Sequence, residues 1–135
     1  MSKSWRTVWT ALALAMAVAV VGCATMSLNT ITNLTPSRLP RKDNDQYWFS
    51  VEFDSRQRTM IRESQRTLVI VGDEVYEMNR VPLTANRWET LVPVPADQSV
   101  VNYFYRFEYD YKAIPEPQFM VIDSKPYRLT ITSAW

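Results

Sequence analysis

Apolar side chains recur at every second position in two segments of the chain. In segment 100–111 one side is wholly aromatic: Tyr103, Tyr105, Phe107, Tyr109 and Tyr111. In segment 46–53 the corresponding side holds Tyr47, Phe49, Val51 and Phe53. A period of two is typical of a β-strand that buries one face. Both segments are therefore predicted to be strands with their aromatic side in a core.

Shorter segments extend the pattern. Further strands are expected near 29–34, 67–71, 74–78, 87–94 and 127–133, with a short extended piece at 119–122. Gly72 and Asp73 separate two of them, and a two-residue loop that starts with Gly favours a type II′ hairpin. Segments 36–45 and 112–126 contain prolines and are predicted to be exposed connections. Segment 55–66 is predicted to be a basic connection with room for one helical turn.

About seven strands at intervals of about 8 to 15 residues, with no helical periodicity after residue 22, predict an all-β, antiparallel sandwich. The strand order over roughly 28–133 resembles an immunoglobulin-like or early-set domain. The resemblance is one of pattern, because the Cys, Trp and Cys framework of immunoglobulin domains is missing.

The N-terminus has a different composition. Lys3 and Arg6 precede the uncharged run 7–21, which is short for a transmembrane helix and fits a secretory signal. Val20-Val21-Gly22-Cys23 then resembles the lipobox of bacterial lipoproteins. The resemblance implies a diacylglycerol on the Cys23 thiol, cleavage before Cys23 and acylation of the new amino terminus. The alternative is an uncleaved anchor helix followed by a free cysteine.

This interpretation divides the chain into a signal peptide, 1–22, with a signal helix, and one sandwich domain, 23–135, with a short N-terminal tether. Two or three acyl chains, palmitate among them, hold a protein durably on a membrane. Ala24 follows the cysteine, where Asp retains members of the resembling family at the inner membrane. The expected location is therefore the periplasmic face of the cell outer membrane.

Composition narrows the chemistry. The chain has no His and one Cys, which removes the common zinc ligands, His-based nucleophilic catalysis and an internal disulfide. Without Lys3 and Arg6 it keeps 13 basic and 14 acidic residues, a balance that gives no support for nucleic acid as a partner. We expect no enzymatic activity, no cofactor and no metal, with Asp43-Asn44-Asp45 forming a solvated turn.

Two aromatic residues stand where the alternation calls for polar ones. Trp48 and Phe104 are expected on the outward faces of their strands, and Arg106 is in step with Phe104. Exposed aromatics with an arginine are typical of binding sites. These three residues are therefore the candidate binding surface. The alternative is a small second core covered by the 112–126 loop.

Charged groups supply two weaker candidates. Arg56, Arg58, Arg62 and Arg66 could bind phosphates of lipopolysaccharide or lipid headgroups, or form an ordinary solvated loop. Glu108 and Asp110 lie about 7 Å apart on one strand face, which is compatible with an inverting glycosidase. Because an exposed face does not raise a carboxyl pKa, cross-strand pairing with arginines is the favoured interpretation.

The sequence thus predicts a membrane-anchored, non-enzymatic envelope lipoprotein that binds another envelope protein as an accessory or structural subunit. The alternative function is a carbohydrate-binding module for peptidoglycan or another glycan.

Overall fold

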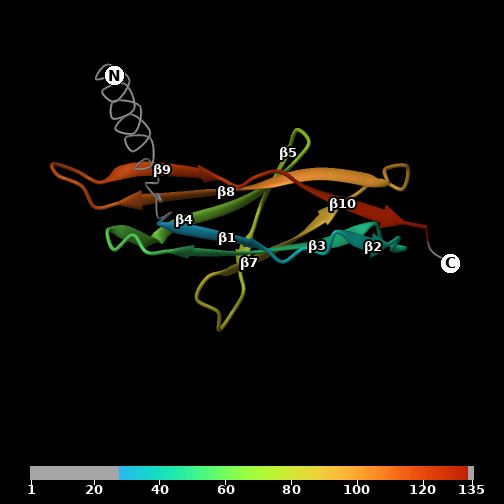
Figure 1. The fold of residues 1–135 in the computed structure, drawn as a ribbon, viewed down its shortest axis with the longest axis horizontal. Helices are drawn as coiled ribbons and strands as arrows, with labels where there is room; N and C mark the ends of the chain where they lie inside the picture. The colour runs from blue at the N-terminus through green and yellow to red at the C-terminus, as the bar shows by residue number, and fades with distance from the viewer. Residues whose placement is uncertain (1–27, 134–135) are drawn as a thin grey trace, which may run out of the picture.

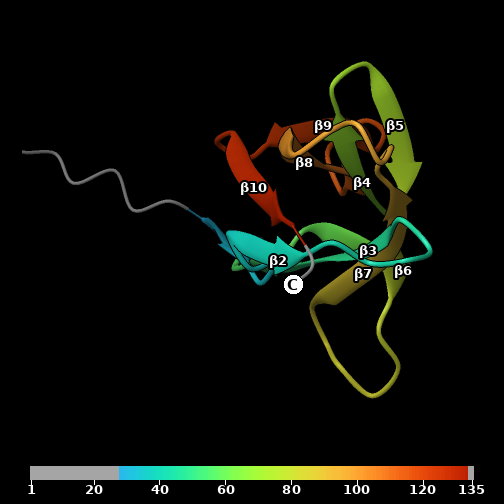
Figure 2. The ribbon, with the colours of Figure 1, turned by 90° about the vertical axis from the view of Figure 1, so that its right-hand side faces the viewer.

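A computed structural model describes residues 28–133 of the chain, which form ten strands. The expected signal helix and the lipidated Cys23 lie outside the described residues. The strands form one sheet of four strands and one of six. The sheets form two layers (Figure 1, Figure 2), which confirms the predicted all-β sandwich.

The first sheet is built from β1 (Asn29–Asn33), β3 (Gln46–Ser55), β7 (Arg87–Pro93) and β6 (Asn79–Arg80). The second contains β2 (Arg38–Pro40), β10 (Tyr127–Thr132), β8 (Val100–Tyr111), β4 (Met60–Val71), β5 (Glu74–Glu77) and β9 (Gln118–Asp123). Every pairing is antiparallel except that of β2 with β10. The order β1-β3-β7-β6 facing β4-β8-β10 is that of immunoglobulin-like sandwiches, which place ABED strands against CFG strands.

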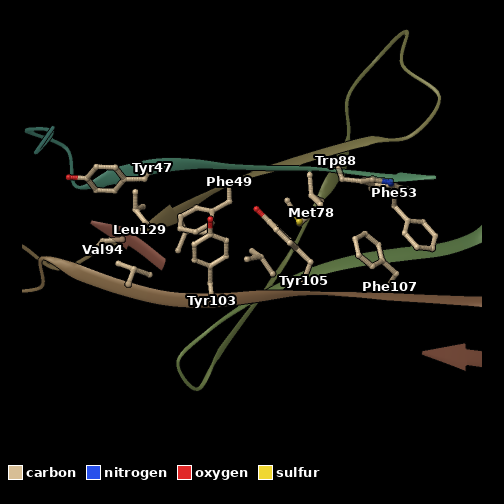
Figure 3. Close-up of a cluster of buried hydrophobic side chains, with 14 of the residues drawn as sticks. Tyr47, Phe49, Phe53, Met78, Trp88, Val94, Tyr103, Tyr105, Phe107 and Leu129 are labelled. Carbon is tan, nitrogen blue, oxygen red and sulfur yellow. The ribbon is translucent and has the colours of Figure 1, made fainter. Parts of the chain in front are cut away.

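The core fills the space between β3 and β8, as their alternation predicts. Tyr47, Phe49 and Val51 of β3 are fully buried, and so are Tyr105 and Phe107 of β8. The rings pack in specific pairs. Phe53 stacks on Phe107 with centroids 4.2 Å apart, and Phe49 meets Tyr103 edge to face at 4.7 Å (Figure 3). Such pairs contribute about 0.5–1.5 kcal/mol each beyond the burial of their area.

A buried polar cluster fixes the passage of the chain from β1 in one sheet to β2 in the other. The Tyr105 hydroxyl donates to Asn33 Oδ1 at 2.7 Å and lies 2.9 Å from Thr35 Oγ1. The N–H of Ser50 donates to the same Thr35 oxygen at 3.0 Å. Burial raises the pKa of Tyr105 above its ordinary value. Through these bonds, the cluster supplies hydrogen-bond partners to polar groups at the point where the chain leaves the first sheet.

The second change of sheet lies in the segment from β5 to β6. Gly72 has φ +58° between β4 and β5, as the predicted hairpin requires, and Val71 pairs with Glu74. After β5 the buried Met78 donates its N–H to the Thr67 carbonyl at 2.8 Å. β6 then pairs with β7 in the opposite sheet. The strand expected at 74–78 ends at Glu77, and the segment 74–80 serves both sheets.

The predicted basic connection at 55–66 is wrong over most of its length, because β4 begins at Met60. Ile61 pairs with Asp110 and Arg66 with Glu108, so residues 62–65 bulge out opposite Tyr109. Ser64 Oγ holds the bulge, donating to the Ile61 carbonyl at 2.6 Å and accepting from the Asp110 N–H at 2.8 Å. The bulge interrupts the period of two, which hid the strand from the sequence pattern.

Two other expected connections also contain strands. The exposed stretch 36–45 includes β2, whose pairing with β10 is parallel. The 112–126 loop includes β9, a slightly longer version of the extended piece expected at 119–122. β2 and β9, together with the two-residue β6, raise the strand number above the expected seven. β2 and β6 have only three and two residues, which is too short to show an alternating pattern.

Candidate functional site

The predicted binding residues lie on opposite surfaces of the sandwich. Trp48 is in β3 and points outward from the first sheet, because its neighbours Tyr47 and Phe49 point into the core. Phe104 and Arg106 are on the outward face of β8 in the second sheet. The aromatic core separates the two faces (Figure 3). The structure therefore does not bring the three residues into one surface, since outward positions of facing sheets point in opposite directions.

Trp48 forms an exposed apolar pair with Leu91. The two residues are direct partners across β3 and β7, and 50% and 41% of their respective surfaces are exposed. The loop that could have covered Trp48 contains β9, which pairs with β8 in the other sheet. Packing of Trp48 in a second core under that loop is thus not observed.

Phe104 is half-buried and belongs to a small apolar cluster on the outer face of the second sheet. Its partner across the strands is Ile70, and Leu68 lies opposite Arg106. Leu68 and Ile70 are only 5% and 8% exposed, although they point away from the main core. The Arg106 guanidinium carbon lies 5.8 Å from the centre of the Phe104 ring. Phe104 therefore matches the second-core alternative more closely than Trp48 does.

Arg106 is held by an acidic neighbour. Its Nε lies 2.7 Å from Asp123 Oδ1, and its Nη2 lies 3.0 Å from Asp123 Oδ2. This two-bond pairing lowers the pKa of the Asp123 carboxyl and raises the pKa of Arg106. A partner group would have to compete with Asp123 for those two donors.

The four arginines predicted as an anion site do not form one cluster. Arg66 pairs with Glu77 at 3.3 Å and with Glu108 at 3.9 Å, the cross-strand pairing expected for Glu108. Arg56 and Arg58 lie in the exposed connection between β3 and β4. Arg62 alone lies in the bulge of β4. The four residues are close in sequence, but strand and bulge geometry directs them to different places.

Arg62 lines a cavity of about 280 Å³ together with Glu63, Gln65, Arg80 and Trp88. Arg62, Glu63 and Gln65 belong to the bulge of β4, and Arg80 and Trp88 are direct partners across β6 and β7. Sequence reasoning missed Arg80. A signal was present, because the turn between Pro82 and Asn86 places the residues before and after it opposite each other.

A larger groove of about 580 Å³ lies between the β4–β5 hairpin and the segment that follows β7. It is lined by Asp45, Val71, Gly72, Glu74, Tyr76, Pro93, Val94, Pro95 and Gln98. Asp45 has a left-handed backbone with φ 53°, and its carbonyl accepts the Val94 N–H at 2.9 Å. The groove draws on three separate segments, so no single stretch of sequence indicates it.

Among residues 28–133, no group of three acidic or cysteine side chains is arranged to hold a metal ion. Within the same residues, no helix has the length and apolar character needed to cross a membrane. Comparison of the chain with protein families, characterised proteins and solved structures gives no significant match.

Proposed function

We propose that the protein is a non-enzymatic lipoprotein of the bacterial envelope that binds another envelope protein as an accessory or structural subunit. The exposed pair of Trp48 and Leu91 carries the binding part of this proposal. The lipobox-like sequence that ends at Cys23 supports the anchoring part. The absence of His from the chain supports a binding role over catalysis.

The surroundings of the pair resemble a small protein interface. Further along β3 and β7, the outward positions are polar. Glu52 lies opposite Arg87, and the buried Ser50 lies opposite Glu89 and accepts a hydrogen bond from Arg87 Nε at 3.2 Å. An apolar centre with a polar rim is the usual organisation of protein interfaces, and Trp is among the residues enriched in their hot spots. The outer face of β3 and β7 is therefore the proposed docking face.

The proposed anchor places this face close to a membrane. Five residues lie between Cys23 and the start of β1 at Asn29, which is six residue steps, and an extended chain spans at most about 3.3–3.6 Å per residue. The first strand therefore starts within about 20 Å of a lipid on Cys23. β1 pairs directly with β3. Asn29 pairs with Ser55, which is seven residues along β3 from Trp48, so Trp48 lies within about 45 Å of that lipid. A partner that docks on Trp48 would therefore be an envelope protein that reaches within this distance of the membrane.

Site-specific photocrosslinking in cells tests the docking face. A photoreactive phenylalanine analogue at position 48 should give a discrete adduct with one envelope protein. The matched control is position 119, where Phe119 is 63% exposed but lies on β9 of the other sheet. A second change, Leu91→Asp, should remove the adduct without changing the melting temperature, because Leu91 contributes to the face and not to the core.

Equal adducts from positions 48 and 119 would argue against a specific face. So would an adduct at position 48 that persists with Leu91→Asp. A fall in melting temperature of more than about 4 °C for Trp48→Ala would assign Trp48 to packing, since about 1 kcal/mol shifts the melting temperature of a domain of this size by roughly that amount.

A glycan-binding module is the second candidate, and the groove beside the β4–β5 hairpin favours it. The half-buried Tyr76 lines the groove together with the polar side chains of Asp45, Glu74 and Gln98. Aromatic surface with a few placed polar groups is the usual composition of a small-ligand site. Retention on purified peptidoglycan that is lost with Tyr76→Ala and kept with Trp48→Ala would support this function. The reverse pattern would exclude the groove as its site.

A further inference from the structure

We propose that the cavity at the bulge of β4 is a binding site for a phosphate monoester, with Arg62 and Arg80 as its cationic groups. The site is separate from the Trp48 face and from the groove. The proposal rests on the geometry of the bulge, the partners of the two arginines and the chain that joins Arg80 to Trp88.

The bulge brings donors from one sheet to the edge of the other. Residues 62–65 face only Tyr109 in β8, and the two bonds of Ser64 fix them in place. As a result, Arg62, Glu63 and Gln65 share a cavity with Arg80 and Trp88. Bulges that redirect side chains are common beside functional sites, and a regular strand would have left these side chains on its own sheet.

Neither arginine is neutralised by a neighbour. Within residues 28–133, Arg62 and Arg80 form no ion pair, whereas Arg41, Arg66 and Arg106 each pair with a carboxylate. Arg80 is nevertheless held in position, because its guanidinium carbon lies 4.8 Å from the centre of the Trp88 ring. Glu63 adds one negative charge, so the lining keeps a net positive charge.

The donor set suits phosphate. Each guanidinium presents a planar fork that binds two oxygens, so one carboxylate saturates one fork, while a phosphate has oxygens for two. The buried indole nitrogen of Trp88 has no hydrogen-bond partner among the described residues. A cavity of about 280 Å³ exceeds the size of a bare anion and leaves room for the organic group that carries the phosphate.

The phosphate could belong to a lipid headgroup or to a soluble sugar phosphate, and the loop between Arg80 and Trp88 is expected to matter only for the lipid. Residues 81–86 project away from the sheets at the bottom of Figure 2, and Leu83 at this loop is fully exposed with φ 62°. The Thr84 hydroxyl donates to the Val81 carbonyl at 2.7 Å, which orders the loop. An apolar side chain there could enter a lipid layer while the arginines bind a headgroup. A soluble sugar phosphate would not need Leu83.

The test uses the full-length protein in dodecylmaltoside micelles with three probes: inorganic phosphate, glucose 1-phosphate and phosphatidic acid mixed into the micelles. Binding is followed by the indole N–H signal of Trp88 in NMR spectra and by calorimetry. We expect saturable shifts of that signal. Arg62→Gln and Arg80→Gln should each weaken binding about tenfold or more, because each removes a charged hydrogen-bond donor.

Arg58→Gln is the matched control, because it removes the same charge from the exposed connection outside the cavity. It should change the affinity less than about twofold, since the effect of a distant exposed charge is screened by salt. Arg62→Glu is a second variant that keeps the test independent of folding. Arg62 is exposed with no carboxylate partner among the described residues, so its reversal should abolish binding at an unchanged melting temperature.

The two phosphate sources give different patterns. Leu83→Asp should weaken binding of phosphatidic acid only, if the ligand is a lipid headgroup. Glucose 1-phosphate that binds more tightly than phosphatidic acid, with no effect of Leu83→Asp, would identify a soluble phosphate ester. The proposal is overturned if no probe shifts the Trp88 signal, or if Arg58→Gln weakens binding as much as Arg62→Gln.

Discussion

Replacing Tyr105 with phenylalanine tests the buried polar cluster in two independent ways. The change removes one oxygen and leaves the ring, so the packing against Tyr103 is kept. It deletes the hydrogen bonds of the hydroxyl with Asn33 Oδ1, Thr35 Oγ1 and the Ser50 carbonyl. The Tyr105 hydroxyl and these three partners lie beside the segment in which the chain passes from β1 to β2.

The expected loss of stability at pH 8 is about 1–3 kcal/mol, the usual penalty when buried polar groups lose a partner. The lower part of that range is favoured by the remaining bonds. Asn33 Oδ1 still accepts the Thr35 N–H at 3.1 Å, and Thr35 Oγ1 still accepts the Ser50 N–H.

The second effect appears at alkaline pH. Burial raises the pKa of Tyr105 in the folded state, while in the unfolded chain it is about 10. Above pH 10 the unfolded state therefore loses a proton that the folded state keeps. The stability of the wild type falls as the pH rises from 10 towards the folded pKa, by up to about 1.4 kcal/mol per pH unit for this group.

A phenylalanine at position 105 cannot ionise, so the stability of the variant does not show the fall above pH 10 that the Tyr105 hydroxyl causes in the wild type. The difference in stability between wild type and Tyr105→Phe should shrink by about 1.4 kcal/mol between pH 8 and pH 11. Urea denaturation of residues 24–135, followed by circular dichroism at both pH values, measures it. Tyr76→Phe, outside the cluster, is the control for loss of a tyrosine.

A difference that stays constant from pH 8 to pH 11 would refute the reasoning, because it would mean that the Tyr105 hydroxyl ionises as readily in the folded state as in the unfolded one. A loss below about 0.5 kcal/mol at pH 8 would show that the cluster does not stabilise the passage between sheets, since changes of that size are common at unremarkable surface positions.

Two further predictions concern the core and the anchor. Phe107→Ala should cost about 3–5 kcal/mol in urea denaturation because it empties the stack with Phe53, whereas Glu108→Ala should cost at most about 1 kcal/mol, the usual value of an exposed ion pair such as that with Arg66. Equal losses would contradict the observed faces of β8. Cys23→Ala should leave an unprocessed precursor without lipid, and incorporation of labelled palmitate into that variant would rule out the proposed anchor.

The buried residues of the core could be predicted because successive residues of a strand point to opposite faces, so an apolar face appears in the sequence as apolar residues at every second position. The alternation in 46–53 and 100–111 identified which aromatics are buried, and the fully buried Phe49 and Phe107 confirm it. The turn at Gly72 could be predicted in the same way, because a two-residue hairpin needs a positive φ that glycine adopts freely. These features depend on neighbours within a few residues along the chain.

The candidate sites could not be predicted in the same way. Trp48 and Phe104 both broke the alternation and looked equivalent, yet one is exposed beside Leu91 and the other lies among Ile70, Leu68 and Arg106. Which residues lie on the neighbouring strands decides that difference, and strand order is a long-range property.

The sequence by itself determined the all-β class and the buried faces of β3 and β8, because both depend on local periodicity. Only the tertiary structure separated Trp48 from Phe104, and only the bulge of β4 placed Arg62 beside Arg80 and Trp88. The physical reason is that a bulge shifts strand register through hydrogen bonds to a partner strand far along the chain, such as that from the Asp110 N–H to Ser64 Oγ.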